Sequence, residues 1–246
     1  MKRRLLVKAL AAPAALALFA SWPALQRAIL GGLFPDVGEL LYSRASLLSL
    51  LADHLILTLS STAAAAVAGF VLGLLAFLER SGAGRRGVAG ISGVAQTFPP
   101  AAVIALAVPS LGFGAPPVLL ALFLYGMLPV VVNTVKGFDG VSPRVREAAR
   151  GVGMNRAQQF LQVELPLALP VILAGVRLSA VINVGTAAIG AVAGAGGLGG
   201  PIIAGLVRFN PSYVLQGALA TALLALSVDA LFGLLATVTR IPGGES

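Results

Sequence analysis

The chain has 246 residues, of which 58% are hydrophobic and only 11% are charged. This composition and a mean hydropathy of +0.96 exclude an ordinary soluble domain and indicate an integral membrane protein. The chain has no cysteine, which excludes disulfides and thiolate metal sites, and we expect no metal and no cofactor. The net charge of +8 is expected to attract anionic membrane lipid, and we do not expect it to bind nucleic acid.

Six apolar stretches follow one another along the chain. Each is long enough to cross a hydrocarbon core, which takes about 20 helical residues. Gly and Ala recur inside them, which suits close contact between helices in lipid. The pattern predicts an all-α integral membrane protein with about six transmembrane helices, at roughly 5–30, 54–78, 88–109, 116–135, 168–193 and 213–238.

The first stretch allows two interpretations. A basic start followed by an apolar run resembles a secretory signal, but the run continues to about Phe34, longer than a usual signal core, which favours a retained helix. Residues 35–53 alternate charges with leucines and are predicted to form an amphipathic helix along the outer interface. We therefore divide the chain into an N-terminal membrane helix with an outer interfacial segment (1–53), a membrane core (54–240) and a short tail (241–246).

The basic residues set the orientation, because cytoplasmic loops are rich in Lys and Arg. With the N-terminus in the cytoplasm, all of the 17 Lys and Arg residues lie toward that side except Arg27, Arg44 and Arg208. Both termini are therefore predicted to be cytoplasmic. The polar segment between the fourth and fifth stretches, residues 142–166, is predicted to face the same side.

This polar segment has the pattern of two short helices joined by a glycine turn. Ser142 followed by Pro143 predicts the start of the first helix, which presents Val145, Ala148, Ala149 and Val152 on one face. Gly151 and Gly153 are predicted to end that helix, with Gly153 at positive φ.

The second helix of the segment is predicted from its two ends. Asn155 and Gln158, three residues apart, have the spacing of a capping box at the start of a helix. Pro166 is expected to close this helix. The result would be a helix–turn–helix knob on the cytoplasmic side of the membrane.

The same segment resembles, position by position, the signature loop of binding-protein-dependent ABC importer permeases: EAA, three residues, Gly, nine residues, an aliphatic residue, one residue, then Leu-Pro. We call residues 142–166 the signature loop. Three further motifs resemble the osmoprotectant branch, whose members import glycine betaine, carnitine or choline: QTFPP (96–100), LFLYGMLPVVVNT (122–134) and GAGGLGGP (194–201). GAGGLG also occurs in methionine-type permeases, so a methionine or other small-solute importer is the alternative. The matching positions of the loop are Glu147, Ala148, Ala149, Gly153, Val163, Leu165 and Pro166.

The resemblance implies the type I ABC importer transmembrane fold, with residues 54–240 as the permease core, in a bacterial or archaeal cytoplasmic (inner) membrane. It implies a second permease subunit, identical or paralogous, an ATP-binding cassette ATPase subunit and an extracytoplasmic solute-binding protein. The chain has no phosphate loop of its own, so we expect a transport subunit and not an enzyme. Docking of the ATPase is assigned to Glu147, Ala148, Ala149, Gly151, Gly153 and Asn155.

Two interruptions of helix are candidates for the translocation path or its gate. Pro99 and Pro100 would kink the third stretch. The glycine-rich run at 194–201 is predicted to form a constriction or re-entrant turn on the outer side, although its glycines serve equally well as packing contacts. The residues assigned to the path or gate are Gln96, Pro99, Pro100, Asn183, Gly196, Gly197 and Leu198.

An ion-coupled transporter is the alternative from a different class, because such proteins need ionisable groups inside the membrane. Asp229 is the one acidic residue within a predicted stretch. Arg177 is expected at the same depth, about 13 Å from the inner surface. We favour a structural ion pair between them over a proton relay.

Overall fold

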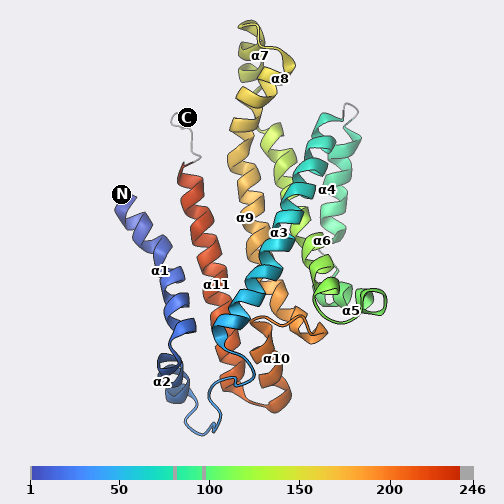
Figure 1. Ribbon diagram of the computed structural model, residues 1–246. Helices are drawn as coiled ribbons and strands as arrows, with labels where there is room; N and C mark the ends of the chain where they lie inside the picture. Colours follow the sequence, from blue (N-terminus) through green and yellow to red (C-terminus); the bar gives the residue numbers. More distant parts are fainter. Residues whose placement is uncertain (1, 80–81, 96–97, 239–246) are drawn as a thin grey trace.

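A computed structural model of the chain describes residues 2–79, 82–95 and 98–238, and these residues form helices and connections without a strand (Figure 1). The principal helices are α1 Lys2–Ser21, α2 Pro23–Leu33, α3 Leu47–Leu78, α4 Ala83–Ala95, α5 Pro100–Leu111, α6 Ala115–Asp139, α7 Pro143–Gly151, α8 Arg156–Gln159, α9 Leu165–Ile189, α10 Gly199–Arg208 and α11 Pro211–Val238. A π-helical turn, Phe160–Glu164, joins α8 to α9, and a 3₁₀ turn, Gly190–Ala193, follows α9.

Four helical segments among the described residues are long and apolar enough to cross a membrane, which confirms the predicted all-α membrane fold. They coincide with the second, fourth, fifth and sixth apolar stretches. A fifth candidate is the pair α1–α2, which is bent by 91°. The bend lies at Trp22, whose φ of −119° and ψ of 89° are not helical, because a residue before proline is disfavoured in the helical region. The four segments are Leu47–Leu78, Ala115–Asp139, Arg156–Ala193 and Pro211–Leu235.

The third predicted stretch, 88–109, is not one helix. α4 ends at Ala95 and α5 begins at Pro100, with Pro99 as its N-cap. Two consecutive prolines supply no N–H for a helical ladder and keep the residue before them out of the helical region. The described residues therefore contain four or five candidate spans, where the sequence predicts about six. Gln96 lies outside the described residues.

The connection between α2 and α3 also differs from the prediction. Residues 34–46 are irregular, and α3 begins at Leu47, so the predicted boundary at 53/54 falls inside a helix. Side chains at the start of α11 donate hydrogen bonds to backbone carbonyls of this connection. In an amphipathic helix these carbonyls would have accepted bonds from N–H groups of the same helix. Asn210 Nδ2 donates to Glu39 O at 2.8 Å, and Ser212 Oγ donates to Leu40 O at 2.6 Å.

α3, α6 and α9 pack against one another through small residues. A Cβ atom at Gly73 of α3 would lie 2.6 Å from Thr134 Cβ of α6, and one at Gly175 of α9 would lie 2.7 Å from Asn133 Cβ of α6. These glycines let the helix backbones approach closely, as is common between membrane helices.

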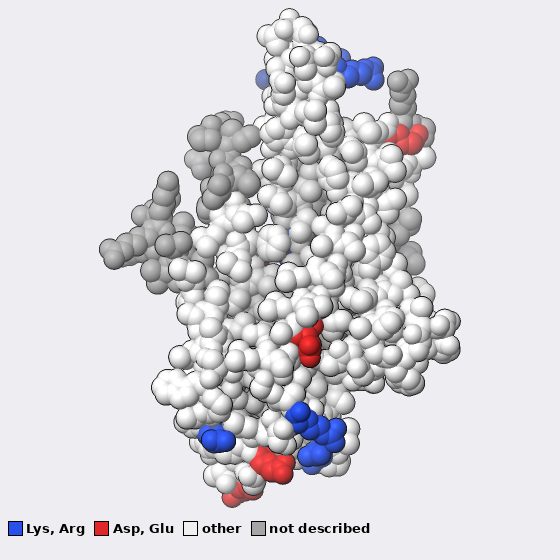
Figure 2. Space-filling model, in the orientation of Figure 1, with Lys and Arg blue, Asp and Glu red and all other residues white. Residues whose placement is uncertain are grey.

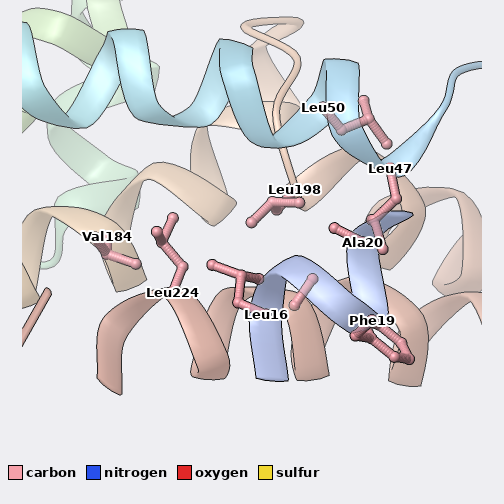
Figure 3. Close-up of a cluster of buried hydrophobic side chains, with 9 residues drawn as sticks. Leu16, Phe19, Ala20, Leu47, Leu50, Val184, Leu198 and Leu224 are labelled. Carbon is pink, nitrogen blue, oxygen red and sulfur yellow. The ribbon is translucent and has the colours of Figure 1, made fainter. Parts of the chain in front are cut away.

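The N-terminal helix belongs to the same folded unit. α1 lies beside α11 (Figure 1), and one buried apolar cluster joins α1, α3, α9 and α11 with the turn before α10 (Figure 3). The cluster consists of Leu16, Phe19, Ala20, Leu47, Leu50, Val184, Leu198, Ala220 and Leu224.

The two ends of the molecule are formed by different helices. α7 and α8 project beyond the other helices at one end, toward which α1 begins and α11 ends, while α2 and α10 lie at the opposite end (Figure 1). On the face in Figure 2, charged side chains gather near the two ends, and the broad band between them is almost free of charge. This distribution suits a protein whose middle crosses lipid. We refer to the α7 end and the α10 end below.

Candidate functional site

The first half of the signature loop folds as the sequence predicts. α7 ends at Gly151, and Gly153 has a φ of +83°. The N–H of Gly153 donates to Arg150 O at 3.0 Å, and the N–H of Met154 donates to Ala149 O at 3.1 Å. This pair of bonds closes α7 at a left-handed glycine two residues after the helix ends. The predicted glycine turn is confirmed.

The second half is confirmed at its start and differs at its end. Asn155 Oδ1 accepts the N–H of Gln158 and Gln158 Oε1 accepts the N–H of Asn155, both at 2.9 Å, which is the predicted capping box. Pro166 does not close the helix, and that prediction was wrong. Pro166 lies in the first turn of α9, directly after the π-helical turn, where the altered hydrogen-bond pattern tolerates a missing N–H. The loop therefore continues into the span Arg156–Ala193 of 38 residues.

Most residues assigned to ATPase docking lie on the surface of the loop. Ala149 is the exception, since it is only 6% exposed and packs inward. Val152, predicted on the same face as Ala149, is 76% exposed. α7 therefore offers a mixed apolar and polar surface to a partner. The exposed assigned residues are Glu147, Ala148, Gly151, Gly153 and Asn155.

One arginine closes the loop on itself and ties it to α6. Arg146 forms an ion pair with Glu164, Nε to Oε1, at 2.8 Å, and both side chains are mostly buried. The same guanidinium donates to Phe138 O at 2.6 Å, and Gln159 Nε2 donates to Arg146 O at 3.3 Å. Sequence reasoning missed this contact. Its only trace in the sequence is Glu164, a single acid just before an apolar stretch.

Three stacked phenylalanines lie under the loop. The rings of Phe77 and Phe138 are 5.0 Å apart at 21°, and those of Phe138 and Phe160 are 5.5 Å apart at 20°. The guanidinium groups of Arg85 and Arg146 lie 5.0 and 5.6 Å from the centroid of Phe77, within cation–π range. The stack joins α3, α6 and the turn before α9, so the rings connect the loop to the spanning helices.

The glycine-rich run near the α10 end forms an irregular turn between two helical segments. Gly194, Gly196 and Gly197 have positive φ, and helix resumes at Gly199. Leu198 is fully buried in the apolar cluster of Figure 3. Its side chain therefore lies within this chain's own core, and its assignment to a path or gate stays a prediction.

His54 of α3 holds this turn in place. The N–H of Leu198 donates to His54 Nδ1 at 3.3 Å, so Nε2 carries the proton and donates to Val184 O at 2.9 Å. A Cβ at Gly197 would lie 2.9 Å from His54 Nδ1. Gly197 is therefore a close-approach residue, the packing alternative left open by the sequence.

Asn183 lies at the crossing of α3, α6 and α9, fully buried. Its Nδ2 donates to Thr62 Oγ1 at 2.9 Å, and a Cβ at Gly126 would lie 2.7 Å from that nitrogen. In the described part of the chain, Asn183 Oδ1 and Ser179 Oγ have no hydrogen-bond partner. Pro99 and Pro100 lie elsewhere, at the start of α5, where Tyr125 OH of α6 donates to the carbonyl of Phe98.

Arg177 and Asp229 are brought together between α9 and α11. Arg177 Nε and Nη2 donate to the two carboxylate oxygens of Asp229, each at 2.6 Å. The two side chains are 39% and 45% exposed at the surface of the isolated chain. Such a bidentate pair fixes both geometry and charge balance.

A cavity of about 300 Å³ opens between α5 and the end of α9. All of its lining side chains are apolar, so it offers no polar side chain to a charged solute. The lining residues are Ala101, Ile104, Ala105, Val108, Phe113, Ile189, Val192 and Ala193.

The family model described as "binding-protein-dependent transport system inner membrane component" matches residues 65–240, which include the signature loop and most of the helical core. The chain belongs to this family. It is a multi-pass permease, the membrane-spanning subunit of a binding-protein-dependent importer. This confirms the resemblance of the signature loop.

Curated relatives of the permease agree with the osmoprotectant branch. The choline transport system permease protein OpuBB of Bacillus subtilis is 37% identical over 192 residues, 78% of this chain and 84% of the relative. The carnitine transport permease protein OpuCB of Listeria monocytogenes is 39% identical over 181 residues, covering 74% and 82%. The osmoprotectant import permease protein OsmY of Salmonella typhimurium is 40% identical over 178 residues, covering 72% and 75%.

A solved structure shares the fold of the permease. An inward-facing form of the MetNI methionine ABC transporter aligns with a TM-score of 0.69 at 20% identity, over 79% of this chain and 96% of that one. At this identity the likeness carries the fold and not the solute.

Proposed function

We propose that the permease forms the translocation path for a quaternary-ammonium compatible solute such as glycine betaine, choline or carnitine. The observation that carries this proposal is the set of relatives named for choline, carnitine and osmoprotectant transport, at 37–40% identity over most of their length. A methionine-type or other small-solute importer is the alternative within the same family. The fold likeness at 20% identity does not favour it.

We propose further that a separate ATP-binding cassette subunit docks on the signature loop and supplies the energy. The loop projects beyond the other helices (Figure 1), exposes both apolar and polar side chains, and rests on the Phe77–Phe138–Phe160 stack. These features suit a surface that the ATPase displaces and that transmits this displacement to three spanning helices. The α7 end, and with it both termini, would then be cytoplasmic, in the cytoplasmic (inner) membrane of the cell.

In this proposal, selection of the solute belongs to an extracytoplasmic solute-binding protein. A quaternary ammonium is recognised by the faces of aromatic rings arranged as a cage. The chain has only one Trp and three Tyr. Tyr42 and Tyr213 pack edge to face on each other, and Tyr125 is bound to the backbone at Phe98. This small number of Trp and Tyr rings favours a path that releases its solute easily.

A second permease subunit, identical or paralogous, would complete the path. The apolar cavity beside α5 and the exposed side chains of Leu106 and Phe113, 74% and 78% exposed, give this side of the chain an apolar surface that a second subunit or lipid covers. Gly196, Pro99 and Pro100 remain candidates for the path or gate in that assembly. Gln96 remains a candidate from the sequence alone.

The ion-coupled alternative rests on Asp229. We assign Asp229 a structural role instead, because both of its carboxylate oxygens are taken by Arg177 at 2.6 Å. A proton relay needs a carboxylate that exchanges protons with water or solute, and a bidentate guanidinium opposes protonation.

Uptake into proteoliposomes tests the proposal. The permease is reconstituted with its ATPase and its binding protein, and labelled glycine betaine, choline, carnitine and methionine are compared, with and without ATP and an ionophore. We expect ATP-dependent uptake of at least one quaternary ammonium, unchanged when proton and sodium gradients are collapsed. Uptake of methionine alone would favour the alternative solute, and gradient-driven uptake without ATP would refute the importer.

A further inference from the structure

The corner between α10 and α11, residues 206–210, presents an aromatic ring at the α10 end. Phe209 is 93% exposed, and its neighbour Val207 is 74% exposed. α10 packs against α11 behind this corner. Nothing in the described part of the chain covers the ring.

The backbone at this ring is strained. Phe209 has a φ of 55° and a ψ of 36° and is the single non-glycine residue with positive φ among those described. The turn requires this conformation, because the N–H groups of Phe209 and Asn210 both donate to Gly205 O, the second at 2.8 Å, and so close α10. Glycine would satisfy the same turn without strain. The fold therefore does not explain a phenylalanine at this position.

The corner is also held rigidly. Asn210 Oδ1 accepts the N–H of Tyr213 at 3.1 Å, while its Nδ2 donates to Glu39 O at 2.8 Å. Tyr213 OH donates to Glu39 Oε2 at 2.6 Å. These bonds tie the corner to the connection between α2 and α3, so the ring projects from a fixed base.

Charged neighbours place the ring outside the hydrocarbon layer. Arg208 Nη1 lies 3.8 Å from Glu39 Oε2, and the two side chains are 48% and 68% exposed. Both residues lie outside the candidate spans, where charged side chains meet water or headgroups. Phe209 follows Arg208 directly, so its ring lies at the same level, and an aromatic residue beside an arginine is the composition typical of protein interfaces.

We propose that the 206–210 corner is a contact point for the solute-binding protein and that the ring of Phe209 enters an apolar pocket on that protein's docking face. The proposal rests on the proposed function, which puts the α10 end outside and requires a binding protein there. A lipid anchor needs apolar area but no fixed backbone. Insertion into a pocket gains affinity when the side chain is already held in its bound orientation, and the strained, hydrogen-bonded corner supplies this.

Stimulation of ATP hydrolysis tests the contact. The permease–ATPase complex in nanodiscs is titrated with binding protein loaded with glycine betaine, and the concentration that gives half of the maximal stimulation is measured. We expect F209A and F209G to raise this concentration at least tenfold. F209G should unfold at no lower temperature than the wild type, because glycine relieves the backbone strain. L33A is the control, because Leu33 is an exposed apolar residue (59%) at the same end with ordinary backbone, and it should stay within twofold.

Two results would overturn the contact. The first is half-maximal stimulation of both Phe209 variants within twofold of the wild type. The second comes from a single-tryptophan reporter, F209W combined with W22F, since Trp22 is the only natural tryptophan. We expect its fluorescence to shift to shorter wavelength on adding binding protein and to resist quenching by brominated lipid; strong quenching would make the corner a lipid anchor. A wild-type complex that no loaded binding protein stimulates would instead refute the importer itself, and the contact with it.

Discussion

Replacing Gly153 by valine tests the assignment of the signature loop to ATPase docking. Gly153 has a φ of +83°, and a Cβ added there would meet no atom within 4 Å. The substitution therefore causes no clash, and its cost comes from the backbone alone. A left-handed conformation costs a non-glycine residue about 1–2 kcal/mol, which lowers the population of the native turn by a factor of about 5–30.

The loop contains its own matched controls for the effect of backbone conformation on stability. Gly151 is exposed, lies at the end of α7 in helical conformation, and also has no atom within 4 Å of an added Cβ. G151A should be neutral or stabilise α7 by about 0.5–1 kcal/mol. G153N should fall between the wild type and G153V, because asparagine tolerates the left-handed region better than a β-branched residue does.

Two measurements are made on the wild type and on each variant of the loop. The amount of ATPase that co-purifies with each variant reports docking, and the solute transported per ATP hydrolysed in proteoliposomes reports coupling. We expect both to fall in the order wild type, G153N, G153V, while stimulation by the binding protein at the opposite end still saturates at the same concentration. If G153V retains its ATPase and transports normally, the docking assignment is wrong. If G153N is as defective as G153V, side-chain bulk and not φ is the cause.

Three further predictions concern the packing of the core. D229A leaves Arg177 without its two hydrogen bonds and should destabilise the fold by about 1–3 kcal/mol. This is below the range for fully buried pairs, because this pair is partly exposed. The double variant D229A with R177L should recover most of the lost stability, measured by thermal unfolding in detergent. G73A puts a Cβ 2.6 Å from Thr134 Cβ and should cost about 1–3 kcal/mol through overpacking, measured in the same way. H54L leaves a buried N–H without an acceptor and should cost about 1–3 kcal/mol, with the turn at 194–198 gaining amide hydrogen exchange.

Each of these predictions has a result that would contradict it. Failure of the double variant to recover, or proton flux that depends on Asp229 during transport, would favour the relay over the structural pair. G87A is the control for G73A, because a Cβ at Gly87 meets no atom within 4 Å; equal stability of the two variants would refute the close-approach argument. An H54L protein with wild-type melting temperature and unchanged exchange would mean that His54 does not hold the turn.

The predictions that succeeded rest on local patterns. The turn at Gly153 and the box between Asn155 and Gln158 depend on residues within one helical turn of each other, so the chain carries the whole signal in a few letters. Pro166 shows the limit of this reasoning. A proline normally marks a helix boundary, but a π-helical turn before it reorganised the backbone bonds, and that turn has no signature in a single sequence.

The features that the sequence did not reveal join residues far apart in the chain. Arg146 and Glu164 pair across the whole signature loop, and His54 meets Leu198 across 144 positions. Hydropathy also gave too many continuous spans, because it sums apolar character and ignores the hydrogen bonds that Pro99 and Pro100 remove from the run at 88–109.

The continuity of one helix connects the two ends of the permease. Because Pro166 does not end the loop's second helix, the segment Arg156–Ala193 runs unbroken for 38 residues, about 55 Å at 1.5 Å per residue. It carries Phe160 at the stack under the loop and Val184 at the contact with His54. Next to Val184, the unpaired Asn183 Oδ1 means that a small shift of α9 against α6 breaks no hydrogen bond at that atom. In the proposed importer, a displacement of the signature loop by the ATPase would therefore reach the turn before α10 along one continuous helical segment.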